Sequence, residues 1–277
     1  MRPLRFAVTG ANGQLGSALV QYLRKEGHVV FELVRAQEKA MDQQYYLFFD
    51  LEKPEQMPNL KGIDVLIHAA YFFDVSCPEK YYMINVDGSQ ALFLKASECR
   101  VSYKILISTI SAYKNARSLY GKTKYKIEQI YLKNSLVLRP GLILNDPLSG
   151  IAGAIQKFVR KYTIVPSIGA GNQMIYPCPI EDLVEKIYHC AIHHVYYHQP
   201  IFVGKETPIT LKQLIMQFSK QEDKKIYIIP IPFFVIYAVL KLLETIKISI
   251  GFRSDSLIGL QYANPEIDFD NTRKIHI

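Results

Sequence analysis

A threonine, a tyrosine and a lysine in one segment of the chain could together carry out proton and hydride chemistry on a carbonyl group. Thr109 precedes Tyr120, and Lys124 follows the tyrosine by four residues. Residues four apart share one face of a helix, so the Lys124 ammonium would favour the phenolate of Tyr120. Thr109 would hold the substrate oxygen while Tyr120 gives or takes its proton. We expect these three residues to be catalytic, with Ser108 and Ser111 left open as substitutes for Thr109.

A glycine-rich turn near the start of the chain gives that segment its context. An apolar run ends at Thr9, glycines follow at positions 10, 13 and 16, and apolar residues then recur at helical spacing. The spacing differs from the Gly-x-Gly-x-x-Gly of the commonest dinucleotide fingerprint. Such a turn still lets backbone N–H groups at a helix N-terminus reach a pyrophosphate. The cofactor-binding residues expected here are Gly10, Asn12, Gly13, Gln14, Leu15 and Gly16.

Several motifs, in one order along most of the chain, resemble the extended or atypical short-chain dehydrogenase/reductases, the NAD-dependent epimerase/dehydratase family. They are Thr9–Gly16, Phe49–Leu51, Asp64–Ala70, Asn85–Ser89, Ile107–Thr109, Tyr120–Lys124, Leu138–Gly141 and Pro179–Leu183. The resemblance implies an enzyme in which Lys124 also holds the nicotinamide ribose. It further implies cofactor contacts at Asp50 and Leu51 near the adenine, at Ala69 and Ala70 beneath the dinucleotide, and at Asn85 behind the site.

The end of the second expected strand bears on the choice between NADP and NAD. Val34 stands where the resemblance expects the acid that binds the ribose 2′-hydroxyl in NAD-preferring proteins, and Arg35 follows it. An arginine there could pair with a 2′-phosphate, which favours NADP. The alternation of side chains along a strand points Glu32 in the other direction, but this acid still leaves NAD as an alternative cofactor.

Apolar runs that alternate with helical patterns predict an α/β fold, a Rossmann-type doubly wound parallel sheet. Strands are expected near 4–9, 29–34, 45–49, 64–68, 103–108 and 135–139, and helices near 15–26, 80–98 and 118–132. We expect a dinucleotide-binding domain over 1–149 with a returning segment at 175–204. A smaller C-terminal substrate lobe would occupy 150–277, as residues 150–174 and 205–277.

The residues after Thr109 help to choose among the reactions known for the resembled family. Sugar dehydratases of the resembled family carry acids there, whereas this chain has Ile110, Ser111 and Ala112. Epimerisation and simple ketone reduction need only Tyr120 and Lys124. The first interpretation is an NAD(P)-dependent sugar-nucleotide epimerase or oxidoreductase. An NADPH-dependent reductase of an apolar ketone or steroid-like substrate and a non-catalytic NAD(P)-binding sensor or scaffold are the alternatives.

The substrate segment gives a weaker indication. Residues 168–173 resemble a glycine loop that touches nucleotide diphosphates in sugar-processing relatives. Those relatives often place an arginine directly after it, whereas Met174 follows here. Arg160, Arg253 or Lys157 could supply the charge from elsewhere.

The composition and charge of the chain limit the classes of ligand and partner that it could bind. The chain has 277 residues, 49% of them hydrophobic, and a net charge of +8. Seven Lys/Arg and no acid lie between Arg100 and Lys126, which suits a phosphorylated ligand, whereas no nucleic-acid-binding motif accompanies them. Four cysteines without a Cys-x-x-Cys pair, and a first strand that starts almost at once, favour a cytoplasmic protein. A homodimer is left open.

Two other features receive plainer interpretations. The histidines at 189, 193, 194 and 198 have helical metal-site spacing, but we expect no metal, since helix ends also favour imidazoles. The uncharged segment 226–240 is too short to span a bilayer, so we expect it to pack in the lobe rather than contact a membrane.

Overall fold

A parallel seven-stranded sheet forms the centre of the protein. The structure is a computed structural model that describes residues 2–36, 44–74, 77–248 and 250–275. The strand order is β11-β6-β5-β4-β1-β2-β3, and every pairing is parallel. The strands are β1 (Arg5–Thr9), β2 (Val29–Val34), β3 (Tyr46–Phe48), β4 (Val65–His68), β5 (Tyr103–Ile107), β6 (Leu136–Pro140) and β11 (Ile201–Val203). The order reverses between β1 and β4, where α/β sheets open a crevice for ligands. The predicted Rossmann-type fold is confirmed.

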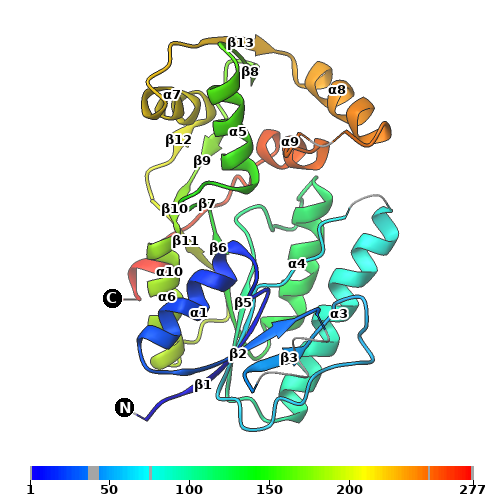
Figure 1. Cartoon of the computed structure of the whole chain (residues 1–277), viewed down its shortest axis with the longest axis vertical. Helices are drawn as coiled ribbons and strands as arrows, with labels where there is room; N and C mark the ends of the chain where they lie inside the picture. The colour runs from blue at the N-terminus through cyan, green and yellow to red at the C-terminus, as the bar shows by residue number, and fades with distance from the viewer. Residues whose placement is uncertain (1, 37–43, 75–76, 249, 276–277) are drawn as a thin grey trace.

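Helices cover both faces of this sheet (Figure 1). Helices α1 (Gln14–Lys25) and α6 (Ile180–Ile192) lie together on one face, and α3 (Pro78–Glu98) and α4 (Leu119–Tyr131) lie on the other. The apolar residues of α1 that recur at helical spacing, from Leu15 to Leu23, are the ones it buries. Helix α4 begins at Ser118, whose hydroxyl accepts the Gly121 N–H at 3.1 Å.

A smaller lobe lies beyond the carboxyl edge of the sheet (Figure 1). Its own core holds buried residues such as Val159, Leu214, Phe218 and Leu257. The helices of the lobe are α5 (Gly150–Lys161), α7 (Leu211–Gln221), α8 (Phe233–Thr245) and α9 (Ser254–Gln261). Its short strand pairs are β9 (Met174–Ile175) with β12 (Ile209–Thr210) and β8 (Ile164–Ile168) with β13 (Tyr227–Ile231). A further pair, β7 (Leu142–Leu144) with β10 (Pro177–Pro179), contributes residues to the cores of both the sheet domain and the lobe.

The end of the chain returns to the sheet domain. The short helix α10 (Asp270–Arg273) lies against β11, and Thr272 donates to the Phe202 carbonyl. Lys186 of α6 donates to the Ile275 carbonyl at 2.9 Å, and Ile275 joins the core beside α1 and α6. These last residues therefore pack apart from the rest of 205–277.

The apolar segment 226–240 divides into β13 and most of α8. Leu240 is buried in α8, whereas much of the helix surface faces outward. The expectation of packing in the lobe holds for one side of the helix. Within the described ranges, no helix combines the length and the apolar character needed to cross a membrane. The four cysteines are free thiols.

Candidate active site

The turn after β1 has the shape of a pyrophosphate cradle. Gly10 has φ +68°, a conformation that L side chains rarely adopt, and its carbonyl accepts the Gly13 N–H at 2.8 Å. A Cβ on Gly16 would lie 2.0 Å from the Gly10 carbonyl oxygen, so helix and turn can approach this closely only with glycine there. Helix α1 has neither a side-chain cap nor an acid in its first turn. Its N–H groups and positive dipole end therefore suit an anionic ligand.

The remaining expected residues of the turn lie around this helix start. Asn12, Gly13 and Gln14 are exposed at the beginning of α1. Leu15 is buried and anchors the helix against the sheet. Asn12 and Gln14 are thus exposed where a ligand would meet the helix start, while Leu15 has a packing role.

A buried hydrogen-bond network joins β1 to the loop after β4. The Thr9 hydroxyl accepts the N–H groups of Ala69 and Ala70, each at 3.0 Å. Its own proton must then go to Nδ1 of His68, 2.8 Å away, which leaves Nε2–H of His68 to donate to Ser89 at 2.9 Å. Burial, with a smaller contribution from Lys124, lowers the pKa of His68 to about 3, so the ring is neutral. This network, which the sequence analysis missed, fixes Ala69 and Ala70 beside Gly10.

Asn85 holds the next part of the same loop. Its side-chain oxygen accepts the Phe72 N–H at 2.8 Å, and its amide donates to the carbonyls of Phe72 and Tyr81, each at 2.9 Å. The side chain is fully buried and both of its ends are engaged. Asn85 therefore acts on the site through the loop backbone.

The ends of β2 and β3 present the candidate adenosine-binding residues. Arg35 is exposed just after β2. Glu32 faces helix α1, as alternation predicts, and pairs with Arg24 at 2.8 Å. Asp50 accepts the Glu52 N–H at 3.1 Å in a tight turn, and Leu51 beside it is buried. Arg35 is the charged side chain of this group that the structure leaves in solvent.

The three expected catalytic residues meet at the carboxyl end of β5. The Thr109 hydroxyl lies near enough to the Tyr120 phenol to lower its pKa. Lys124 is buried, and its ammonium donates to the Ile107 carbonyl at 2.8 Å. Ser111 donates its N–H to Thr109 at 3.2 Å. Two hydroxyl groups are thus placed where one substrate oxygen could meet both.

Electrostatics give the phenol a definite protonation state. Burial raises the pKa of Tyr120 to about 12, and the nearby Thr109 hydroxyl opposes that rise. Burial also lowers the pKa of Lys124 to about 8, opposed by the charge of Glu128. At neutral pH Tyr120 is therefore protonated and can donate its proton. The lowering of the Tyr120 pKa by Lys124 stays a prediction from the sequence.

Aromatic side chains surround the phenol, a feature that the sequence analysis missed. The Tyr71 ring meets the Tyr120 ring edge-on with centroids 5.1 Å apart, and the exposed Phe73 ring stacks on Tyr120 at 6.2 Å. The Lys124 ammonium lies 4.6 Å from the centroid of Tyr71. The run Tyr71-Phe72-Phe73 directly after Ala70 is the sequence signal that could have indicated an apolar mouth.

A buried ion pair supports the catalytic helix from behind. Arg139 of β6 donates from Nε and Nη2 to the Glu128 carboxylate at 2.9 and 2.6 Å. The Ser108 hydroxyl donates to the same carboxylate at 2.5 Å, which gives Ser108 a structural partner next to Thr109. Glu128 follows Lys124 by four residues, and this continuation of the Tyr120–Lys124 row could have revealed it from the sequence.

The lobe contributes a segment that binds the start of α4. The Asp255 carboxylate accepts the N–H groups of Leu119 and Tyr120 at 2.7 and 3.0 Å. These are helix-start donors without an intrahelical partner, so Asp255 caps the helix that carries the phenol. Arg253 donates to the Phe73 carbonyl, and Arg160 forms a bidentate pair with Glu222 at 2.9 and 2.8 Å. Two arginines considered for phosphate binding thus have protein partners.

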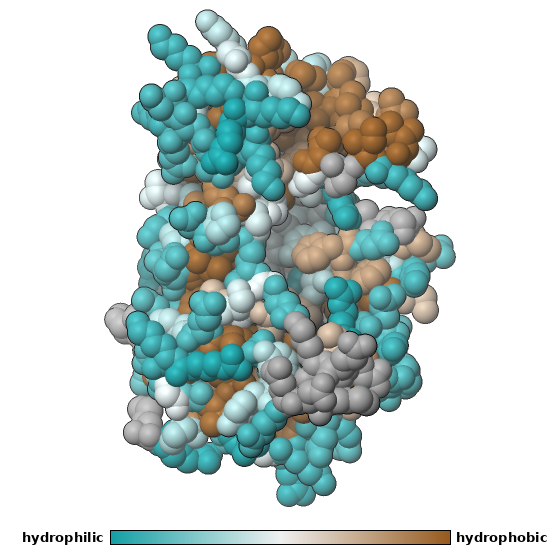
Figure 2. Space-filling model, viewed as in Figure 1, coloured by the Kyte–Doolittle hydropathy of each residue, from teal (hydrophilic) through white to brown (hydrophobic). Residues whose placement is uncertain are grey.

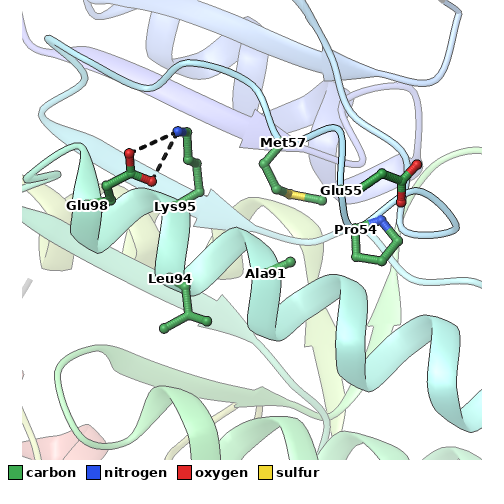
Figure 3. Close-up of a pocket in the computed structure, with 7 residues that line it drawn as sticks. All are labelled: Pro54, Glu55, Met57, Ala91, Leu94, Lys95 and Glu98. Carbon is green, nitrogen blue, oxygen red and sulfur yellow. Dashed lines mark hydrogen bonds and ion pairs between the residues drawn. The ribbon is translucent and has the colours of Figure 1, made fainter.

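Two hollows lie away from these groups. One of about 460 Å³ lies on the C-terminal half of α3, beside Pro54 and Met57, with the Lys95–Glu98 ion pair at its rim (Figure 3). That end of α3 leads to the start of β5, opposite the carboxyl edge. A second, apolar hollow of about 140 Å³ lies inside the lobe among α5, α7, α8 and α9.

No metal cluster is found within the described ranges. No group of three or more His, Cys, Asp or Glu side chains there could hold an ion. The rings of His189 and His193 lie 4.4 Å apart near the end of α6.

The protein has the features of the short-chain dehydrogenase/reductase class. These are the strand order of the Rossmann-type sheet, the glycine turn after β1, and the group formed by Thr109, Tyr120 and Lys124. Residues 6–133 match the model of the NAD dependent epimerase/dehydratase family. Over this stretch, a little under half of the chain, the match agrees with the family resemblance that the motifs indicate.

Curated relatives and solved structures extend the comparison. The chain is similar to a 4-hydroxy-2-methyl-3-oxo-4-farnesyl-3,4-dihydroquinoline-1-oxide ketoreductase of Stigmatella aurantiaca (27% identity over 168 residues, 50% of each chain). It is also similar to a ceramide reductase of Caulobacter vibrioides (27% over 196 residues, 65% of this chain and 59% of the relative). The matches thus span between half and three fifths of these relatives' lengths. The UDP-glucose 4-epimerase of Thermotoga maritima, solved with UDP-glucose, has a TM-score of 0.68 at 21% identity over 83% of this chain and 86% of its own, which shows the fold.

Proposed function

We propose that the protein is an NAD(P)-dependent oxidoreductase that transfers hydride at a carbinol or ketone carbon and reduces lipophilic ketones. The observation that carries this proposal is the grouping of the Thr109 hydroxyl with the Tyr120 phenol at the carboxyl end of β5, with Lys124 buried one helical turn further on. The reduced cofactor, when bound, supplies the hydride. The residues of the chain position the reactants and deliver the proton.

The cofactor would lie across the carboxyl edge of the sheet. Backbone N–H groups at the start of α1 would hold its pyrophosphate, above Ala69 and Ala70. Lys124 would bind the nicotinamide ribose. The exposed Arg35 would pair with a 2′-phosphate, which favours NADPH over NADH.

The protonation state of the phenol favours the reductive direction. With a pKa of about 12, Tyr120 holds its proton at neutral pH and can donate it to a ketone oxygen as hydride reaches the carbon. Thr109 would donate a second hydrogen bond to the same oxygen. The ammonium of Lys124 would stabilise the phenolate that remains.

The surroundings of the phenol favour an apolar substrate. Tyr71 and Phe73 contact the Tyr120 ring, while Arg160 and Arg253 are bound to Glu222 and to the Phe73 carbonyl. The names of the two curated relatives describe a farnesyl-bearing quinoline and a ceramide, both lipophilic. This is the apolar-ketone alternative that the sequence analysis left open.

Epimerisation of a nucleotide sugar is the second candidate. The family model and the likeness to a UDP-glucose 4-epimerase favour it. An epimerase would use the same three residues and would hold its dinucleotide through purification.

A turnover comparison tests the proposal. The purified chain is assayed with NADPH or NADH against a long-chain ketone and against UDP-glucose, beside a Tyr120→Phe variant. We expect ketone-dependent NADPH oxidation that falls about a hundredfold or more in Tyr120→Phe, with dinucleotide affinity nearly unchanged. Full turnover in the variant would contradict the role of the phenol, and activity on UDP-glucose with a retained dinucleotide would favour the epimerase.

A further inference from the structure

Helix α8 carries apolar side chains on two opposite sides. On the inner side, Leu240 is 4% exposed and Phe233 and Ile236 pack against the lobe core. On the outer side, Val235, Val239, Leu242 and Ile246 follow one another at intervals of four, three and four residues, and all are exposed. This spacing places them on one stripe of the helix surface.

We name as the α8 face the exposed residues Phe234, Val235, Val239, Leu242, Ile246 and Ile248. Figure 2 shows brown, hydrophobic side chains gathered at its upper right, where α8 lies in Figure 1. The strand that leads into the helix, β13, adds exposed Tyr227 and Ile229. A continuous apolar stripe of this kind on a surface marks an interaction site.

Positive charge borders this face. Residues 224–253 contain five Lys and Arg and a single acid, Glu244. Lys225, Lys241 and Lys247 are exposed. Glu244 is partly buried, accepts the Ser254 N–H and hydroxyl at 2.7 and 2.9 Å, and pairs with Lys241 at 3.3 Å, which leaves Lys225 and Lys247 as the exposed lysines outside this pair. The face thus combines an apolar centre with a cationic border.

We propose that the α8 face docks the protein on the surface of a lipid bilayer that contains anionic lipids. An apolar stripe with flanking lysines is what such a surface binds, because the acyl region receives the apolar side chains and the headgroups attract the lysines. The helix has 13 residues, fewer than the roughly 20 that a span requires, so it would lie in the plane of the interface.

The same charges oppose dimerisation through the α8 face, in which a second copy of this chain would cover it. A two-fold dimer through the α8 face would bring identical patches together. The lysines of one border would then approach those of the other. A bilayer with negative headgroups has the opposite charge and meets no such repulsion.

Hydrogen bonds link the α8 face to the mouth of the active site. Glu244 near the end of α8 binds Ser254, the next residue Asp255 caps α4 at Tyr120, and Arg253 binds the Phe73 carbonyl. Docking would therefore hold at the bilayer a helix that is joined by hydrogen bonds to the segment at the mouth of the site. That a lipophilic ketone is taken up there rests on the proposed function, whereas the docking does not.

Vesicle flotation of the whole 277-residue chain tests the docking without any activity measurement. Leu242 on the α8 face is 62% exposed, and Leu94 on α3 is 58% exposed, so Leu242→Asp and Leu94→Asp are a matched pair. Wild-type protein should float with vesicles of phosphatidylcholine and phosphatidylglycerol, less with phosphatidylcholine alone, and less again as salt rises. Leu242→Asp should lower the bound fraction roughly tenfold or more, while Leu94→Asp leaves it unchanged.

Three outcomes would overturn the proposal. The first is failure of the wild-type protein to float with anionic vesicles, and the second is an equal loss of binding in both aspartate variants. A wild-type dimer that Leu242→Asp converts to a monomer would show that a second copy covers the face. Circular dichroism checks that the variants are folded, and Val239→Ser replaces Leu242→Asp if that variant is not.

Discussion

Glu128→Gln tests how strongly the buried ion pair behind the catalytic helix supports the fold. Glutamine has nearly the same shape, so the substitution removes the charge without opening a cavity. Arg139 donates two hydrogen bonds, at 2.9 and 2.6 Å, to a carboxylate that is fully buried. Removing that charge leaves a buried guanidinium without its counter-ion, which costs about 3–5 kcal/mol of unfolding free energy. The new amide NH2 group also places a donor against a donor of Arg139 or of Ser108, which lies beside Thr109, so turnover should fall as well.

An exposed ion pair of the same form provides the control. Arg160 binds Glu222 through the same two nitrogens at 2.9 and 2.8 Å, but its side chain is 66% exposed. Glu222→Gln should therefore cost about 1 kcal/mol or less. Urea unfolding at pH 7, followed by circular dichroism, measures both variants against wild type. Equal losses in the two variants would refute the argument that burial sets the contribution of the pair.

Three further variants test other parts of the account. Gly16→Ala would place a Cβ 2.0 Å from the Gly10 carbonyl oxygen, so NADPH affinity, measured by fluorescence titration, should fall tenfold or more; unchanged affinity would contradict the tight turn. The neutral His68, with a pKa of about 3 against 6.5 in the unfolded chain, makes folding weaker as the pH falls below 6.5, because the unfolded state binds the proton first. Between pH 6.5 and 4.5, urea unfolding should show wild type losing about 2–3 kcal/mol more than His68→Gln, and parallel losses would refute this. Asp255→Ala should cost about 1–2 kcal/mol and reduce turnover, while exposed Asp87→Ala does neither; equal effects would exclude a capping role.

The sheet could be predicted closely from the sequence because each of its strands is a compact apolar run between turn residues. The strands expected near 29–34 and 103–108 appear as β2 and β5, and the helix expected at 118–132 appears as α4. The glycine turn and the row from Tyr120 to Lys124 were visible for the same reason, since local spacing determines which side chains share a helix face.

The parts that could not be predicted depend on contacts between distant segments. Asp255 caps a helix start that lies 135 residues earlier in the chain at Tyr120, and no local pattern indicates such a partner. The network of Thr9 and His68 likewise joins two strands that pair only in the folded sheet. Hydropathy indicated that segment 226–240 is apolar, but it could not show that the chain covers only one side of α8.

The most direct test of the account is the path of the hydride. NADPH deuterated at the nicotinamide C4 position that is transferred would be incubated with the protein and a lipophilic ketone, and the product analysed by mass spectrometry. The account predicts deuterium on the new carbinol carbon with wild-type protein and almost none with Tyr120→Phe, which still binds NADPH. Tight NADPH binding without deuterium transfer to either a ketone or a nucleotide-sugar intermediate would contradict the assignment of Thr109, Tyr120 and Lys124 as a hydride-transfer site.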